Sequence, residues 1–321
     1  MRRLLAARDE EPRLSVHVAV AIVGFRNAGD IARCLEALGR STHADFEVVV
    51  CENGGREAFD ELVRALPEKL AGGQPVHAFG AERNLGFAGG VNRCLAALPA
   101  ADAWWVLNPD TEPAPDALEI QLARLDKGDC DAVGCTLHLA DGTVQSYGGH
   151  WQAWLARAIS IGHGERQGTP VDARLIEARQ NYLNGASMLI GRAFLERAGP
   201  MREDYFLYCE EVEWCLRARS CGLRLGFAPG AIVLHHQGST TGNDREVGRK
   251  SRLPVRLNAR NQILVTRDCF PARLPIVALA ALGVILMRFG KRRAWRQLGF
   301  GLEGWAAGLA DERGVPSWLT S

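Results

Sequence analysis

Residues 46–55 read FEVVVCENGG, an apolar and largely β-branched run that ends in a carboxylate, an amide and two glycines. A short continuous apolar run of this kind is typical of a buried strand, and Asn and Gly are typical of turns. Residues 103–113, AWWVLNPDTEP, repeat the arrangement, with Asp110 just after the apolar run. Each segment taken singly is equally an ordinary turn. Together, two carboxylates that follow strands predict a polar site at one edge of a sheet.

Short apolar runs alternate with helix-period segments over the first 110 residues, which is typical of strand and crossover-helix units in a parallel sheet. We predict strands at 16–23, 46–51, 76–79 and 103–107. Apolar residues about one turn apart predict a helix after each of the first three strands: Ile31, Leu35 and Leu38, then Leu62, Val63, Leu66 and Leu70, then Val91, Leu95 and Leu98. The fold class is therefore α/β, a mostly parallel sheet flanked by helices. Ligands of such sheets bind at the carboxyl ends of the strands.

Composition narrows the function further. The chain has 321 residues, 47% hydrophobic and 23% charged, as in a globular protein. Its formal charge of +1 supplies no broad field for nucleic acid. The nine cysteines include no C-x-x-C pair, so we expect neither a disulfide framework nor a zinc site, and we expect a reducing cytoplasm. The tail at residues 1–15 meets charges before any long apolar segment, so we predict no signal peptide.

Two common phosphate motifs are missing. The first strand is followed by Gly24-Phe25-Arg26-Asn27 and not by G-x-G-x-x-G, and no G-K-[ST] occurs, so dinucleotide binding and P-loop chemistry lose support. Residues 83–92, RNLGFAGGVN, are either a flexible helix entry or a backbone cradle. In the cradle, free amides at the helix start, with Arg83 beside them, would hold a diphosphate or sugar hydroxyls.

The second half is organised differently. Residues 131–139 and 143–145 predict a hairpin around Asp141-Gly142, and a loop at 147–170 carries Trp151 and Trp154. These tryptophans either belong to the core or stack on an acceptor sugar. Small residues at 184–187 lead into an apolar run and then a helix that ends at Gly199, and they would let a substrate approach the backbone closely.

The densest polar cluster is YFLYCEEVEWCLR at 205–217, followed by FAPGAIVLHH at 227–236. The glutamates at a helix start are either surface charges that favour the helix dipole or members of a site. Glu210 and Glu211 would lie about 100° apart around the axis, so only one can point squarely into a shared site. The histidines that end the apolar strand are either structural or ligands.

These pieces, in this order, resemble the inverting nucleotide-sugar glycosyltransferases of family 2, which have the GT-A fold, and within them the rhamnosyltransferase-like branch. The likeness covers roughly residues 16–270. It is carried by six motifs, at 50–53, 84–92, 107–110, 184–192, 205–217 and 229–239.

The resemblance implies roles for single residues. Glu52 stands where an Asp contacts the nucleotide base, and Asp110 is the last acid of a DxD-type metal motif whose first position is Asn108. His235 completes the metal's coordination, and Glu211 stands where an Asp serves as catalytic base. The remaining expected contacts are with the donor, at Asn53, Arg83, Asn84, Gly86, Phe87 and Asn92, and with the acceptor or sugar, at Gly185, Ala186, Trp151 and Glu210.

The implied reaction is a single displacement with inversion. A Mn2+ or Mg2+ ion held by Asp110 and His235 would neutralise the diphosphate leaving group, and Glu211 would accept the proton of the acceptor hydroxyl. The branch implies a nucleotide-diphosphate donor, dTDP-rhamnose or else a UDP-sugar, and a glycan or lipid-linked acceptor in cell-surface polysaccharide assembly. The alternative is a catalytically impaired nucleotide-sugar-binding or scaffold protein, because the base position is altered.

We divide the chain into the tail at 1–15, a catalytic domain at 16–250 and a helical region at 251–321. Within the catalytic domain, 16–112 would bind the nucleotide and 113–250 the acceptor. The apolar segment 274–289 has sixteen residues, fewer than the roughly 20 that span a bilayer, and basic residues follow it. It is either a buried helix or a helix in the membrane interface, on the inner face of the cell membrane.

Overall fold

The structure, a computed structural model, describes residues 16–236 and 246–319. The N-terminal tail and positions 237–239 of the last motif lie outside the described residues.

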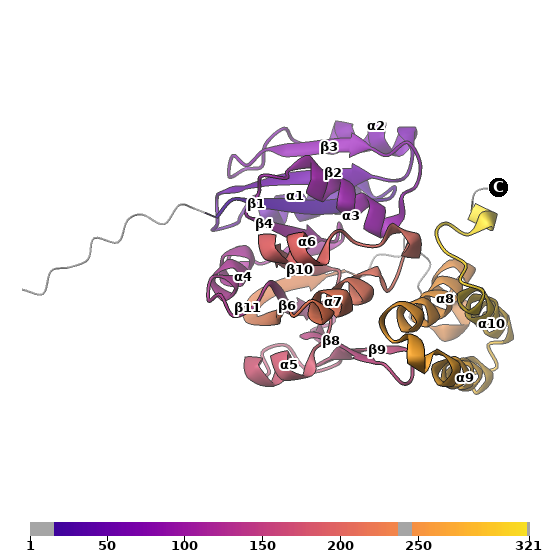
Figure 1. The fold of residues 1–321 in the computed structure, drawn as a ribbon. Coiled ribbons are helices and arrows are strands. Elements are labelled where there is room, and N and C mark those ends of the chain that lie inside the picture. Colours follow the sequence, from indigo (N-terminus) through magenta and orange to yellow (C-terminus); the bar gives the residue numbers. More distant parts are fainter. Residues whose placement is uncertain (1–15, 237–245, 320–321) are drawn as a thin grey trace, which may run out of the picture.

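Nine strands of the described chain form one sheet in the order β3-β2-β1-β4-β10-β6-β11-β5, with β7 paired to β6 (Figure 1). The strands are β1 (Val18–Gly24), β2 (Phe46–Glu52), β3 (Val76–Gly80), β4 (Ala103–Leu107), β5 (Thr111–Pro113), β6 (Ala132–His138), β7 (Val144–Ser146), β10 (Ser187–Gly191) and β11 (Leu225–His235). Strands β3, β2, β1 and β4 are parallel, and β10 runs antiparallel to β4 and β6. Strand β11 is parallel to β6. The predicted mostly parallel α/β sheet is confirmed.

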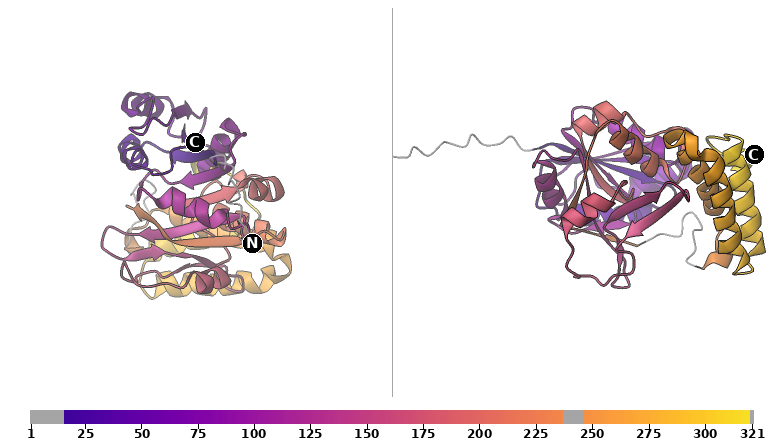
Figure 2. Two further views of the ribbon diagram at one scale, coloured as in Figure 1. Left: turned by 90° about the vertical axis from the view of Figure 1, so that its left-hand side faces the viewer. Right: turned by 60° about the horizontal axis from the view of Figure 1, so that its bottom comes forward.

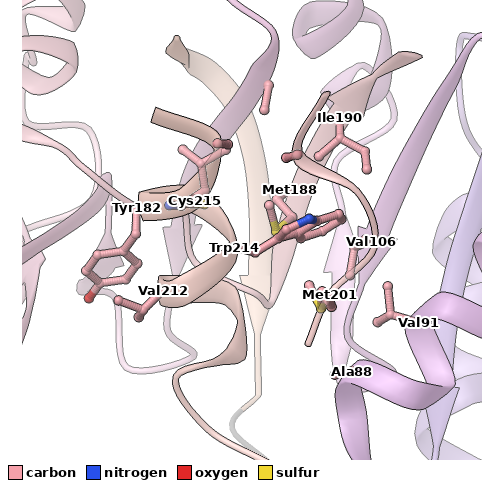
Figure 3. Close-up of a cluster of buried hydrophobic side chains, with 14 of the residues drawn as sticks. Ala88, Val91, Val106, Tyr182, Met188, Ile190, Met201, Val212, Trp214 and Cys215 are labelled. Carbon is pink, nitrogen blue, oxygen red and sulfur yellow. Dashed lines mark hydrogen bonds between the residues drawn. The ribbon is translucent and has the colours of Figure 1, made fainter. Parts of the chain in front are cut away.

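Alternation along the strands builds a core on each face of the sheet. On β1, Ala19, Ala21 and Val23 join one cluster, while Val18, Val20 and Ile22 join the other. The first cluster, drawn in Figure 3, lies under α3, α6 and α7, and the second under α1 and α4. The helices of this part are α1 (Ala28–Leu38), α2 (Arg56–Ala65), α3 (Gly86–Ala97), α4 (Ala117–Leu125), α5 (Ala173–Arg179), α6 (Arg192–Ala198) and α7 (Glu210–Ser220). Both faces are covered, which explains the continuous apolar runs of the central strands.

Two helices end earlier than their apolar spacing predicts. Helix α2 stops at Ala65, so Leu66 and Leu70 lie beyond it, and Leu66 has an extended ψ of 134°. Helix α3 stops at Ala97, before Leu98. Pro67 follows Leu66 and Pro99 follows Leu98, and proline disfavours the helical conformation of the residue before it.

The predicted loop at 147–170 is wrong, because it contains two strands. Strands β8 (Gly148–Gln152) and β9 (Arg157–Ile161) pair antiparallel as a separate small sheet. Their sequences, GGHWQ and RAISI, lack a clean alternation of apolar and polar residues, so the period that reveals a strand is missing. Trp151 on β8 is 2% exposed and belongs to the core, whereas Trp154 in the turn is 55% exposed.

Three long helices follow the sheet: α8 (Arg252–Cys269), α9 (Leu274–Ile285) and α10 (Trp295–Leu309). They lie side by side at one end of the sheet (Figure 2). Helix α8 contacts α7, α9 and α10, and the indole of Trp305 on α10 donates to the carbonyl of Ala278 on α9 at 2.8 Å. The C-terminal region is therefore attached to the sheet through the helix that carries the glutamates.

Candidate active site

The parallel strands β1, β2, β4 and β11 all end at one edge of the sheet. Glu52 is the last residue of β2, His235 is the last residue of β11, and Asp110 lies between β4 and β5. The edge that the sequence predicted as a site thus carries all three side chains.

The Glu52 carboxylate stabilises the two turns that follow β1 and β2. Its Oε1 accepts from the backbone N–H groups of Gly54 at 2.6 Å and Arg26 at 3.0 Å. The residue is 1% exposed, and Oε2 has no hydrogen-bond donor among the described residues. A Cβ on Gly24 would come within 2.6 Å of Oε2, so only glycine fits beside this carboxylate. Oε2 is a buried acceptor that a ligand's N–H group could satisfy.

Asn53 and Asn84 shape the start of α3. The Asn53 amide donates to the carbonyl of Gly86 at 2.8 Å, and Asn84 Oδ1 accepts from the Gly86 N–H at 2.9 Å. Gly86 has a φ of +72°, and a Cβ there would come within 2.1 Å of the carbonyl oxygen of Phe206. Glycine is therefore required at this position on both conformational and steric grounds.

The predicted backbone cradle is not open at the first two amides of α3. The Gly86 N–H is used by Asn84, and the Phe87 N–H donates to Phe206 O at 2.8 Å. Asn92, also predicted to contact the donor, instead bonds with Met201 through both its amide and its oxygen, at 2.9 Å each. Its amide also donates to Glu203. Arg83 is exposed beside the loop.

Asp110 and His235 face each other. Asp110 Oδ1 lies 3.2 Å from His235 Nε2, and the two side chains are 13% and 10% exposed. Two atoms bound at about 2.1 Å on adjacent positions of an octahedral ion lie roughly 3 Å apart, so the observed separation fits joint coordination. Groups of three or more His, Cys, Asp or Glu that could hold an ion are absent from the described residues. Any ion here would draw its other ligands from substrate and water.

Gln145 orients this histidine. Its Oε1 lies 2.7 Å from His235 Nδ1 and accepts a hydrogen bond from it, which leaves Nε2 as the ring nitrogen that faces Asp110. Metal-binding histidines commonly have such a partner on the second nitrogen. No local pattern in the sequence indicates Gln145, since it lies 90 positions from His235 on a three-residue strand.

Asn108 and Ala186 meet through their backbones. The N–H of Asn108 donates to the carbonyl of Ala186 at 3.0 Å, and the Ala186 N–H donates to the side chain of Asn184. The Ala186 methyl group is 3% exposed and packs in the core. The side chains of Ala186 and Trp151, which were predicted to contact the acceptor or sugar, are therefore both packed in the core and are not exposed.

Glu211 lies at the meeting point of three motifs. It is in the first turn of α7, and a Cβ on Gly185 would come within 3.5 Å of its Cβ and Cγ and 3.7 Å of the Phe87 ring. The motifs at 84–92, 184–192 and 205–217 thus converge on one small space. Glu210, by contrast, is 3% exposed, and its Oε2 has no donor among the described residues.

Burial affects the pKa values of Glu210 and Glu211 to different degrees. It raises the pKa of Glu210 well above the usual range, and the neighbouring charge of Glu211 raises it further. Burial also raises the pKa of Glu211, where backbone N–H groups at the helix start oppose the rise. Two adjacent buried carboxyls do not ionise together readily. Burial therefore favours the neutral form of Glu210 more strongly than that of Glu211.

The chain is similar to known glycosyltransferases. A model of the family described as glycosyltransferase like family 2 matches residues 12–253. The chain is 23% identical over 250 residues to the N-acetylglucosaminyl-diphospho-decaprenol L-rhamnosyltransferase of Mycobacterium tuberculosis, covering 70% of this chain and 78% of the relative. It is 25% identical over 251 residues to the uncharacterized protein y4gI of Sinorhizobium fredii. That match covers 75% of this chain but spans only 27% of the relative.

Two solved structures have a similar fold. The mannosyltransferase PcManGT from Pyrobaculum calidifontis, in complex with GDP-Man and Mn2+, gives a TM-score of 0.57 at 16% identity, covering 94% of this chain and 89% of that one. GalNAc-T7 with UDP, GalNAc and Mn2+ gives a TM-score of 0.55 at 17% identity, covering 78% and 51%. At these identities the likeness establishes the GT-A fold alone.

Proposed function

Because the chain belongs to the glycosyltransferase-like family 2, we propose that it is a metal-dependent, inverting glycosyltransferase. It moves a sugar from a nucleotide-diphosphate donor to a hydroxyl of a glycan or lipid-linked acceptor in cell-surface polysaccharide assembly. The observation that carries the proposal is the pairing of Asp110 with His235 at the edge where the Glu52 strand also ends.

The donor is held at the strand ends. Glu52 Oε2, a buried oxygen with no donor among the described residues, is the acceptor that we propose for a nucleobase N–H. A Mn2+ or Mg2+ ion held by Asp110 and His235 would neutralise the charge that develops on the leaving diphosphate. Asn53, Asn84 and Gly86 shape the loop next to this site, and Arg83 is the exposed cation beside it.

Glu211 is the proposed base. Its ionised carboxylate accepts the proton of the acceptor hydroxyl, and that oxygen forms a bond to the anomeric carbon from the face opposite the diphosphate. The bond from the anomeric carbon to the diphosphate oxygen breaks, and its electron pair leaves with the nucleotide. A single displacement of this kind inverts the anomeric centre. Gly185 and Phe87, which border Glu211, would face the reacting sugar.

The relatives favour one substrate class. The Mycobacterium tuberculosis relative is named for rhamnosyl transfer to N-acetylglucosaminyl-diphospho-decaprenol, a lipid-linked acceptor. We therefore propose dTDP-rhamnose as the first donor to try, with UDP-sugars next, and a polyprenyl-diphosphate sugar as acceptor.

A membrane-facing surface would suit such an acceptor. The helical stretch from Pro271 to Gly290 has 20 residues, enough by length and composition to cross a membrane. An 18-residue window within it has a mean hydropathy of 1.9 and is 28% buried. Val277, Ala278, Ala281 and Ile285 are its buried residues in α9. The opposite face is exposed and apolar, at Ile276, Leu279, Leu286 and Met287.

Charge completes this surface. Exposed basic side chains follow the apolar face, at Arg288, Lys291, Arg292, Arg293 and Arg296. A helix with one packed face and one exposed apolar face, ending in cations, fits the interface of an anionic bilayer better than a span. We propose that the protein binds peripherally to anionic lipid there, on the inner face of the cell membrane.

The test begins with binding and ends with product. Nucleoside diphosphates are screened for thermal stabilisation with and without Mn2+, and the best nucleotide selects the sugar donors for transfer assays. We expect Mn2+-dependent stabilisation and a product whose anomeric configuration, read by NMR, is opposite to that of the donor. Tight nucleotide binding with no transfer to any polyprenyl-diphosphate or glycan acceptor would instead favour a binding or scaffold protein.

A further inference from the structure

The four residues before α7 have an unusual backbone. Phe206, Tyr208 and Cys209 have φ values of +66°, +73° and +68°, although none is glycine. L residues rarely adopt this region, and such residues persist only where the surrounding structure holds them. Cys209 is also the N-cap of α7, so this segment sets the position of Glu211 two residues later.

Phe206 has the rarest of these conformations. Its φ of 66° and ψ of −59°, with the Leu207 N–H donating to Tyr205 O at 2.8 Å, define a γ-turn with a positive φ. This turn is strained. The Phe206 ring is 3% exposed, so packing as well as hydrogen bonding holds it.

Asn261 on α8 supplies the hydrogen bonds. Its amide nitrogen donates to three carbonyl oxygens of this segment, at 3.0 Å to Tyr205, 2.9 Å to Leu207 and 2.7 Å to Tyr208. Two amide hydrogens serve three acceptors, so at least one is shared. The side chain is fully buried.

Arg260 fixes the orientation of this amide. Its Nε donates to Asn261 Oδ1 at 2.9 Å, so the oxygen must face the guanidinium and the NH2 group must face the carbonyls. The same guanidinium donates to Tyr205 O at 2.9 Å and to Gly314 O at 2.8 Å. Burial lowers the pKa of Arg260 to about 10, which still leaves it protonated at neutral pH.

The segment also contacts the donor side. Phe206 O accepts from the N–H of Phe87 at the start of α3, and Gly86 leaves no room for a Cβ against that carbonyl. The same four residues therefore lie between the α3 loop on one side and Asn261 on the other. Anything that loosens them changes both the donor loop and the first turn of α7.

We infer that Asn261, oriented by Arg260, is a positioning residue that fixes Glu211 relative to the donor loop by holding residues 206–209 in their strained conformation. The inference rests on the proposed role of Glu211 as base. It assigns a catalytic consequence to the helical region, which lies outside the catalytic domain that carries Glu52, Asp110 and His235.

The test compares Asn261→Ala with Thr266→Val. Thr266 is equally buried on α8, and among the described residues its hydroxyl bonds to the Gln262 carbonyl of its own helix. For Asn261→Ala we expect kcat per folded molecule to fall at least about tenfold, since a base displaced by about 1 Å can cost a hundredfold. The affinity for Mn2+ should stay within about threefold of wild type, since Asp110 and His235 are untouched. Thr266→Val should keep kcat.

The pH profile of kcat distinguishes a positioning role of Asn261 from a purely stabilising one. Loosening the segment admits water around Glu211, so the acid limb of the kcat profile in Asn261→Ala should move to lower pH, while Thr266→Val keeps the wild-type profile. Should Asn261→Ala fail to fold, Asn261→Ser, which retains one donor, takes its place with the same split expected. Unchanged kcat and pH profile in the folded variant overturns the inference.

Hydrogen exchange keeps this test independent of the proposed function. In Asn261→Ala, amides 206–213 should exchange faster than in wild type, and those of β1 should not. If the wild-type protein transfers no sugar, the proposed function fails, and with it the catalytic consequence. Hydrogen exchange then tests only whether Asn261 holds the segment before α7. Unchanged exchange at amides 206–213 would refute that role as well.

Discussion

Asp110 Oδ1 and His235 Nε2 lie 3.2 Å apart although the two residues are 125 positions apart in the chain. The contact depends on a short antiparallel pairing of β5 with β11, in which Thr111 lies opposite His235. The backbone also contributes, because the N–H of His236 donates to Asp110 O at 2.9 Å. The pair is thus held in place by strand pairing and by a backbone hydrogen bond.

Removing either member of this pair should abolish metal-dependent nucleotide binding. Asp110→Ala and His235→Ala each leave one protein ligand, so we expect Mn2+ to add no thermal stabilisation beyond that of the nucleotide alone. His236→Ala is the control, because His236 pairs with Glu112 at 2.7 Å outside the proposed ligand pair. Full Mn2+-dependent stabilisation in Asp110→Ala would contradict the assignment.

Gln145→Leu should weaken the metal site without removing a ligand. Without its partner, His235 can take the other tautomer, in which Nε2 carries the proton and cannot bind a cation. Loss of such a partner typically costs about 10- to 100-fold in metal affinity. Mn2+ binding measured by electron paramagnetic resonance checks this, with Gln152→Leu on β8 as the matched change. Equal Mn2+ affinity in the two variants would leave Gln145 without this role.

Glu210→Gln should become more stabilising as pH rises. Burial raises the pKa of Glu210, so the folded state prefers the neutral form, which Gln imitates. The wild-type protein has the full contribution below the unfolded pKa near 4.3 and loses it as pH rises through the folded pKa, by up to about 1.4 kcal/mol per pH unit. Thermal unfolding at pH 5 and pH 8 should therefore show the variant gaining on wild type.

Glu213→Gln is the matched control for that experiment. Glu213 is buried on the same helix but pairs with Arg217, through Oε1 at 2.7 Å and Oε2 at 3.1 Å. Removing its charge leaves the guanidinium short of a partner and should destabilise the protein at both pH values. A Glu210→Gln variant that is destabilised by the same amount at both pH values would mean that Glu210 is ionised in the fold.

The exposed face of α9 should govern binding to vesicles. Leu279→Glu combined with Met287→Glu places two charges on the apolar face and should lower partitioning onto anionic vesicles by about tenfold or more. Leu279 is 70% exposed, and Leu175 on α5, 62% exposed, offers the control variant Leu175→Glu. Binding should also weaken with added salt. If the wild-type protein ignores anionic vesicles at low salt, the face has another use.

What the sequence could reveal was local. Buried strands such as β1 and β2 appear as apolar runs, and the residues after them were placed at the correct edge because parallel strands end together. Apolar spacing alone predicts helices that extend past the ends of α2 and α3. The prolines at 67 and 99 are the local signal that these helices end earlier.

The long-range partners could not be predicted. Gln145 meets His235 only because β7, β6 and β11 are neighbours. Asn261 meets the carbonyls of Tyr205, Leu207 and Tyr208 only because α8 packs on α7. The one hint was a pair of polar residues, Arg260 and Asn261, inside an otherwise amphipathic helix. Polar residues that are buried need partners, but the sequence does not say which.

Glu211→Gln should separate binding from chemistry. The amide keeps the shape of the side chain but cannot accept the proton, so kcat should fall by about two or more orders of magnitude while nucleotide affinity changes little. Glu210→Gln, one residue away, should retain most of the activity, because burial favours the neutral form of Glu210, which Gln imitates. Single-turnover rates and nucleotide titrations on both variants check the two halves of this prediction.

The pH profile and a shortened side chain refine the test. Burial raises the pKa of Glu211, so the wild-type rate should rise with pH through that raised value, and Glu211→Gln should lose this limb along with its activity. Glu211→Asp withdraws the carboxylate by about 1.5 Å, which should leave a reduced but measurable rate with the same limb. A dead Glu210→Gln beside an active Glu211→Gln would move the base by one residue and rotate the catalytic face of α7 by about 100°.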